Sequence, residues 1–89
     1  MQVTLGKEGL DCSWQDRFEE NVKCIHCGAI ARIAFVAHEG IKKKPGKSDK
    51  FVCDLHNNDD GKMWLHDFCA VAVYFCEECL EATAEYNQA

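Results

Sequence analysis

The sequence predicts a single small α+β domain that spans residues 1–89, and three observations lead to this fold class. The composition is 47% hydrophobic and 28% charged, which is typical of a folded chain. Segments with helical periodicity flank a segment that alternates like a β-strand. Seven cysteines stand mostly in close pairs, and a chain this short often needs cross-links or bound metal because its apolar core is small. We therefore expect a small α+β metal-stabilised domain.

An amphipathic helix is expected near the N-terminus, over residues 13–22. Ser13 is followed three residues later by Asp16, which resembles a capping box with Asp in place of the usual Glu or Gln. Trp14, Phe18 and Val22 then recur at four-residue spacing, which places them on one face of a helix. We expect this face to pack on the rest of the domain.

A β-hairpin is expected in the middle of the chain. Ile33, Phe35 and Ala37 alternate with their neighbours, as in a half-buried strand. Residues 40–50 hold the sole proline and several lysines, which predicts an exposed lysine-rich loop. The segment 51–56 then looks like the end of a returning strand.

The last third of the chain is ambiguous. Residues 64–75 mix β-branched and aromatic residues, as a strand does, but their aromatic residues also fit helical spacing. Beyond them a C-terminal helix is expected over residues 77–87, because Cys79, Ala82 and Tyr86 would share one of its faces.

Four residue pairs have the spacing of metal ligands. In each pair two residues separate the ligands, which lets both side chains of a tight turn bind one ion. Eight ligands of this kind divide into two complete tetrahedral sites, so we expect two structural zinc ions (Zn2+) per chain. The pairs are Cys24 and Cys27, Cys53 and His56, His66 and Cys69, and Cys76 and Cys79.

Three partitions of these pairs into two sites are open. Sequential pairing joins neighbouring pairs, but a straight strand would separate Cys69 from Cys76 by roughly 20 Å. Nested pairing avoids this problem, because its outer site takes the first and last pairs and its inner site takes the middle two. A cross-brace would join the first pair to the third. The nested arrangement is favoured over the sequential one, with the cross-brace behind both.

The two ends of the chain carry a family resemblance. NVKCIHCG and VYFCEECLEATAEY resemble the two halves of a treble-clef zinc finger, in which a zinc knuckle leads into a hairpin and the last CxxC begins a helix. VYFCEECLEA is similar to the zinc-binding domain of the ClpX chaperone. The resemblance covers about 25 residues and implies zinc at Cys24, Cys27, Cys76 and Cys79, together with a docking role. The insert from Lys42 to Cys69 departs from that pattern.

Other chemically notable residues have plainer interpretations. Cys12 is expected to be a free or buried thiol, and His38 to lie at the surface. His26, inside the first CxxC, is expected to face solvent or to donate a supporting hydrogen bond. The aromatic residues that precede the last cysteine pair are interpreted as core: Trp64, Phe68 and Phe75.

The function expected from these features is a protein-interaction or regulatory adaptor in the cytoplasm, not an enzyme. The N-terminus lacks the apolar stretch of a signal peptide, so thiols are expected to stay reduced. A formal charge of −5 disfavours general nucleic-acid binding, although the lysines between Lys42 and Lys50 form a local positive patch. Two alternatives stay open: a nucleic-acid-binding zinc finger that uses this patch, and a rubredoxin-like iron or thiol redox protein. A homodimer is compatible with the sequence.

Overall fold

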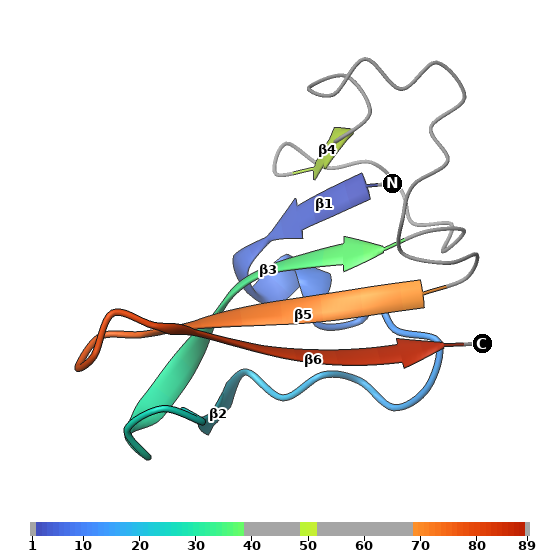
Figure 1. Cartoon of the computed structure of the whole chain (residues 1–89). Helices are drawn as coiled ribbons and strands as arrows, with labels where there is room; N and C mark the ends of the chain where they lie inside the picture. The colour runs from blue at the N-terminus through green and yellow to red at the C-terminus, as the bar shows by residue number, and fades with distance from the viewer. Residues whose placement is uncertain (1, 39–48, 52–68, 89) are drawn as a thin grey trace.

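A single antiparallel β-sheet forms the domain in this computed structural model (Figure 1). The structure describes residues 2–38, 49–51 and 69–88. Its elements are β1 (Gln2–Leu5), the 3-10 turn η1 (Gly6–Gly9), β2 (Asn21–Lys23), β3 (Ile30–His38), β4 (Asp49–Phe51), β5 (Cys69–Cys76) and β6 (Ala82–Gln88).

The strands are arranged around β3, in the order β4-β1-β3-β5-β6. The short β2 pairs with the first residues of β3, and β1 pairs with its last residues, so both lie along the same edge of this strand. Along the other edge, β5 pairs with β3 over nearly its whole length, and β6 continues the sheet beyond β5. The hairpins β2–β3 and β5–β6 therefore have their turns at the same end of the sheet.

One β-bulge divides β3. Ile33 pairs with Tyr74, whereas Phe35 pairs with the adjacent Val73, so Ala34 is the extra residue on β3. Cross-strand partners point to the same face of a sheet and neighbours in a strand point to opposite faces. Ile33 and Phe35 therefore lie on opposite faces, although simple alternation predicted one shared face.

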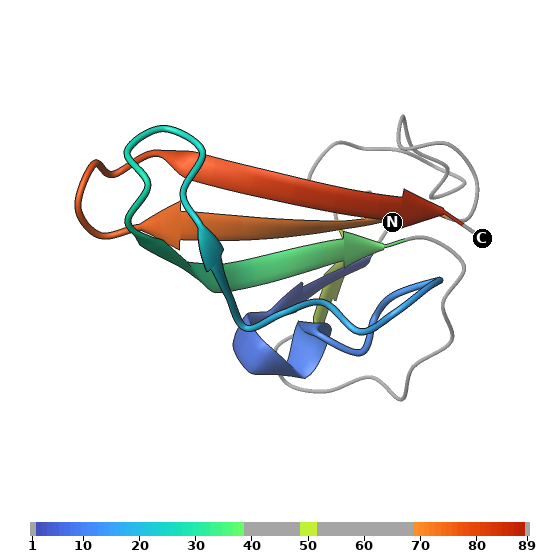
Figure 2. The same ribbon diagram turned by 90° about the horizontal axis from the view of Figure 1, so that it is seen from below.

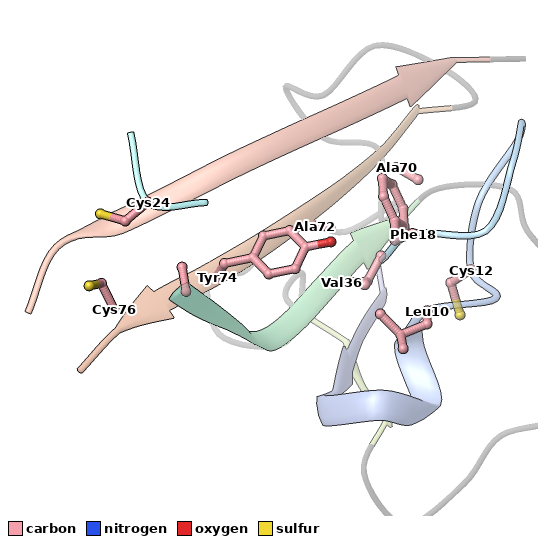
Figure 3. Close-up of a cluster of buried hydrophobic side chains, with 10 residues drawn as sticks. Leu10, Cys12, Phe18, Cys24, Val36, Ala70, Ala72, Tyr74 and Cys76 are labelled. Carbon is pink, nitrogen blue, oxygen red and sulfur yellow. The ribbon is translucent and has the colours of Figure 1, made fainter. Parts of the chain in front are cut away.

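The main hydrophobic core lies on one face of the sheet, beneath the N-terminal segment (Figure 3). Tyr74 on β5 is fully buried and belongs to the same core cluster as Ala72 and Val36. The segment after η1 covers this face with Leu10 and Phe18, and both are buried. Figure 2 shows η1 and this segment on the same side of the sheet.

The expected N-terminal helix is wrong. Residues 13–20 form bends and irregular chain, and β2 occupies the end of the predicted helix. Ser13 does make local bonds, because its hydroxyl donates to the carbonyl of Asp16 at 2.6 Å, but these form a turn. The backbone carbonyls of Glu19 and Glu20 accept hydrogen bonds from Tyr74 and Ile33 on the sheet. Such a short helix is marginal by itself, so these long-range bonds prevail.

The expected C-terminal helix is also wrong, and with it the α+β and treble-clef-like fold class. Residues 77–79 form a turn, and β6 pairs with β5 from Ala82 to Gln88. Ala82 and Tyr86 do share a face, but they share it as alternate residues of a strand. The residues that the structure describes contain no α-helix, and none of their helical turns could cross a membrane. The fold that is observed is a small antiparallel β-sheet domain.

Two smaller expectations are wrong as well. His38 is 2% exposed, because it ends β3 on the core side and its Nε2 lies 3.2 Å from the hydroxyl oxygen of Thr4. Phe75 was interpreted as core but is 54% exposed, because it points to the face opposite Tyr74 and stacks edge-on against Phe35. Cys12 is a buried free thiol, as expected.

Candidate metal centre

Four cysteine side chains meet at the end of the sheet where the two hairpins turn. The Sγ atoms of this four-cysteine cluster all lie within 4.8 Å of one another. Two close contacts cross between the hairpins: the Sγ of Cys24 lies 3.6 Å from that of Cys79, and the Sγ of Cys27 lies 3.5 Å from that of Cys76. Figure 3 shows Cys24 and Cys76 at the same end of the buried core. Strand pairing between β3 and β5 brings the two turns together.

Both turns have the same backbone construction. In knuckle 1, residues 24–28, the N–H of Gly28 donates to the carbonyl of Cys24 at 3.0 Å. In knuckle 2, residues 76–80, the N–H of Leu80 donates to the carbonyl of Cys76 at the same distance. The first cysteine of each knuckle also bonds across its hairpin, from Cys24 N–H to Ala29 and from Cys76 N–H to Glu81. This end of the sheet is thus built from one local motif used twice.

The knuckles differ at their final residue. Gly28 has φ +78° and Leu80 has φ +61°, so both adopt the left-handed conformation. Glycine adopts this conformation without strain, whereas for an L-residue with a Cβ atom it costs about 1–2 kcal/mol of conformational free energy. Leu80 is also 86% exposed, so no burial of its side chain offsets this cost.

Backbone N–H groups point at the sulfur of Cys24. Chiefly the N–H of Cys27, together with that of His26 at 3.4 Å, lowers the pKa of Cys24 from about 9 to about 6, against the opposing effect of burial. Donors of this kind stabilise a thiolate, the form of cysteine that binds metal. The sulfur of Cys24 is therefore prepared to carry charge before a cation binds.

The sulfurs of Cys27 and Cys79 resist ionisation in the protein without a cation. The N–H of Ala29 lowers the pKa of Cys27, but the neighbouring Cys76 thiol and burial more than compensate, so this pKa is raised. The N–H of Glu81 likewise acts on Cys79, but burial and the three other thiols raise the pKa of Cys79 to about 12. Four thiolates this close repel one another. A divalent cation at the centre would supply the missing positive charge.

The donor set fits a tetrahedral metal ion. With metal–sulfur bonds near 2.3 Å, the sulfurs of a regular tetrahedron lie about 3.8 Å apart. The two short contacts of 3.5 and 3.6 Å and the limit of 4.8 Å bracket this value. Four cysteine sulfurs in this geometry match zinc or iron.

Contacts outside the cluster hold knuckle 1 against β6. The N–H of Ile25 donates to the hydroxyl oxygen of Thr83 at 3.2 Å, and Thr83 is 3% exposed. His26 Nε2 lies 3.1 Å from the carbonyl oxygen of Ala82, which can only accept, so this nitrogen is the protonated one. His26 thus combines the two roles expected of it, an exposed ring and a supporting hydrogen bond. Arg32 on β3 pairs with Glu77 of knuckle 2 at the surface, at 3.2 Å.

The structure thus brings together four of the eight predicted ligands, the outer site of the nested arrangement. Cys69 begins β5 and lies about 23 Å from Cys76 along the strand, at about 3.3 Å per residue, so it is not part of this cluster. The remaining predicted ligands lie outside the described residues: Cys53, His56 and His66. So do Trp64, Phe68 and residues 40–48 of the expected lysine-rich loop. The last two residues of that loop, Asp49 and Lys50, belong instead to β4, which pairs with β1 and not with β3, so the expected hairpin with the strand at 33–37 is wrong.

Two supporting residues went unnoticed in the sequence, Thr83 and Leu80. No pattern in the sequence marks Thr83 as a supporting residue, because its role depends on β6 lying beside knuckle 1. A pattern does mark Leu80: it occupies the position after CxxC at which the first pair carries Gly28. Aligning the two pairs would have shown a leucine where a left-handed residue is required.

Comparison of the chain with protein-family models, with curated proteins and with solved structures finds no match.

Proposed function

We propose that the four-cysteine cluster binds one structural zinc ion and that the domain is a protein-interaction module. The proposal places the protein in a compartment that keeps thiols reduced, such as the cytoplasm. The observation that carries it is the convergence of four cysteine sulfurs within 4.8 Å, from two turns of identical construction.

The zinc is proposed to be structural because the cluster is a closed set of ligands. Four protein ligands complete a tetrahedral zinc site, whereas catalytic zinc keeps one position for water or substrate. The cluster also joins two hairpins whose core is small, so binding free energy would contribute directly to folding. These features support an interaction module over an enzyme.

An interaction role is supported by exposed apolar residues in and next to the two knuckles. Ile25 in knuckle 1 is 73% exposed and Leu80 in knuckle 2 is 86% exposed. Ile30, at the start of β3, is 68% exposed. Large aliphatic side chains that gather at one end of a domain often mark a contact surface.

Native mass spectrometry with metal analysis tests the zinc proposal. The reduced chain should retain zinc, and Cys24→Ser should carry one ion fewer. Cys12→Ala is the matched control, because Cys12 is buried but is not one of the four clustered cysteines, and it lies at the other end of the core in Figure 3. Its loss should leave the metal count unchanged. If Cys24→Ser fails to fold, cobalt(II) substitution of the unmodified chain still reports the site through its tetrahedral tetrathiolate absorption. A chain that binds neither ion would refute the proposal.

An iron–tetrathiolate redox centre is the second candidate. Backbone N–H groups donate toward the sulfurs of Cys24, Cys27 and Cys79, and such bonds tune the potential of an iron–sulfur site. Zinc leaves the purified protein colourless, whereas iron bound to four thiolates makes it red. Metal analysis of protein purified without added metal separates the two.

A further inference from the structure

The two knuckles provide an internal comparison that isolates Leu80. Their hydrogen bonds match, and their last residues share one left-handed conformation. Knuckle 1 meets this requirement with Gly28, the residue that adopts the conformation without strain. Knuckle 2 meets it with a leucine whose side chain is 86% exposed. Neither the backbone of the knuckle nor packing within the domain calls for a leucine there, so another cause is needed.

Strain combined with exposure indicates contact with another molecule. Residues held in sparsely populated backbone conformations concentrate at functional sites. Ile25 resembles Leu80 in being a large, exposed aliphatic residue of a knuckle. Each of them follows directly on one of two cysteines, Cys24 and Cys79, whose sulfurs lie 3.6 Å apart. Both aliphatic residues therefore stand next to the cysteine contact that joins the two knuckles.

The charge around these side chains is negative. Glu77, Glu78 and Glu81 are all exposed in or beside knuckle 2. A metal ion of charge +2 bound by four thiolates leaves about −2 at the centre. Two of the described basic residues lie near the knuckles. Arg32 is paired with Glu77. Lys23 lies against knuckle 1, where its Cε is 3.5 Å from the position that a Cβ of Gly28 would occupy. Acidic groups thus dominate the rim of this apolar tip among the residues that the structure describes.

We infer that the tip formed by Ile25 and Leu80 is a docking surface for a segment of another protein that presents aliphatic or aromatic side chains flanked by lysine or arginine. Apolar contact accounts for the exposed aliphatic pair, and the acidic rim selects the basic flanks and steers their approach. The same rim repels nucleic-acid phosphates. This inference rests on the proposed function, since the metal centre positions both knuckles.

The test uses the metal-loaded full chain and a short synthetic peptide of alternating lysine and leucine. Amide resonances of Ile25 and Leu80 should shift on titration, followed by nuclear magnetic resonance. A lysine–serine peptide and a glutamate–leucine peptide should each bind about tenfold more weakly or worse, because one lacks the apolar contact and the other the charge. Equal binding of all three peptides would overturn the inference, as would unmoved Ile25 and Leu80 amides.

Leu80→Gly separates docking from structure. It should weaken peptide binding about tenfold, the minimum expected for loss of a buried leucine contact, while the domain becomes more resistant to denaturant. Tyr86→Ala is the matched control, because Tyr86 is 71% exposed on β6 outside the knuckles, and its binding should equal that of the unmodified chain. Unchanged binding by Leu80→Gly, or equal weakening by Tyr86→Ala, would refute the proposed surface.

Two further readouts complete the experiment. Sedimentation of the peptide-free protein should show monomers. If the protein instead associates, and Leu80→Gly abolishes the association, then a second copy of the chain occupies the tip and the inference is overturned. Native mass spectrometry of the same sample gives its metal content. A metal-free folded chain would refute the proposed function, whereas a zinc-loaded chain that ignores the lysine–leucine peptide would refute only the docking surface.

Discussion

Tyr74 connects the sheet to the irregular N-terminal segment, and its hydroxyl should make stability depend on pH above 10. The side chain is fully buried and donates to the backbone carbonyl of Glu19 at 2.6 Å. Burial, followed by the negative charges of Glu85 and Glu19, raises the pKa of Tyr74 from 10 to about 12. In the unfolded chain the phenol regains its usual pKa.

The direction and size of the effect follow from this difference. Below pH 10 the phenol is protonated in both states, and the contribution is complete. Above pH 10 the phenol ionises in the unfolded chain but stays protonated in the folded one, and this lowers the free energy of the unfolded state. The free energy of unfolding therefore falls until the phenol of the folded protein also ionises near pH 12. The full loss is about 2–3 kcal/mol, at about 1.4 kcal/mol for each pH unit between the two values.

Tyr74→Phe removes both the hydrogen bond and the titration. Below pH 10 the variant should be about 1–3 kcal/mol less stable, because the bond is lost and the Glu19 carbonyl keeps no partner in its place. Between pH 10 and 12 this deficit should shrink by the 2–3 kcal/mol that only the unmodified chain loses. Denaturant unfolding followed by tryptophan fluorescence, at matched metal content, measures both quantities.

Tyr86→Phe is the control, because Tyr86 is 71% exposed. Its unfolding free energy should follow that of the unmodified chain across the same pH range. Titrating groups other than these two tyrosines are common to all three proteins and cancel in the differences. A deficit of Tyr74→Phe that stays constant from pH 9 to 12 would show that the reasoning about burial is wrong.

Three more predictions concern backbone conformation, packing and protons. Gly28→Ala should destabilise the domain by about 1 kcal/mol in denaturant titrations, because its φ is +78° and the nearest atom to a new Cβ, 3.5 Å away, leaves room for it. Gly9→Ala should lower the free energy of unfolding by about 1–3 kcal/mol through steric overlap, since a Cβ there lies 2.9 Å from both the Thr4 carbonyl oxygen and the Val36 side chain. Equal losses of stability in Gly28→Ala and Gly9→Ala would contradict this distinction. Zinc binding at pH 7 should release protons, because Cys79 has a pKa of about 12 before metal binds and must lose its proton to bind the ion. Calorimetry in buffers of different ionisation enthalpy measures this release. A zinc affinity that does not rise with pH would refute the prediction.

The cysteine spacing predicted the two knuckles correctly because their geometry is local. Each is a turn of five residues closed by its own backbone hydrogen bonds, and two residues between the cysteines suffice to bring the sulfurs together. The strand at residues 30–38 was also predictable, since alternation reflects a half-buried surface.

The failures arose where one pattern fits two periods. Ala82 and Tyr86 share a face in a helix, where they are four apart, and also in a strand, where they are alternate residues. Backbone pairing with β5 makes residues 82–88 a strand. The expected helix at residues 13–22 failed for a related reason, because partners on the sheet engage the carbonyls of Glu19 and Glu20.

The sequence alone therefore determined that two CxxC turns could each present a pair of sulfurs. Only the tertiary structure decided that these two turns belong to one site, because the alignment of β3 with β5 places Cys24 beside Cys79 and Cys27 beside Cys76. Local hydrogen bonds within a few residues fix the shape of a turn. Which turns meet depends on pairing and burial between residues far apart in the chain, and these are set by the whole sheet.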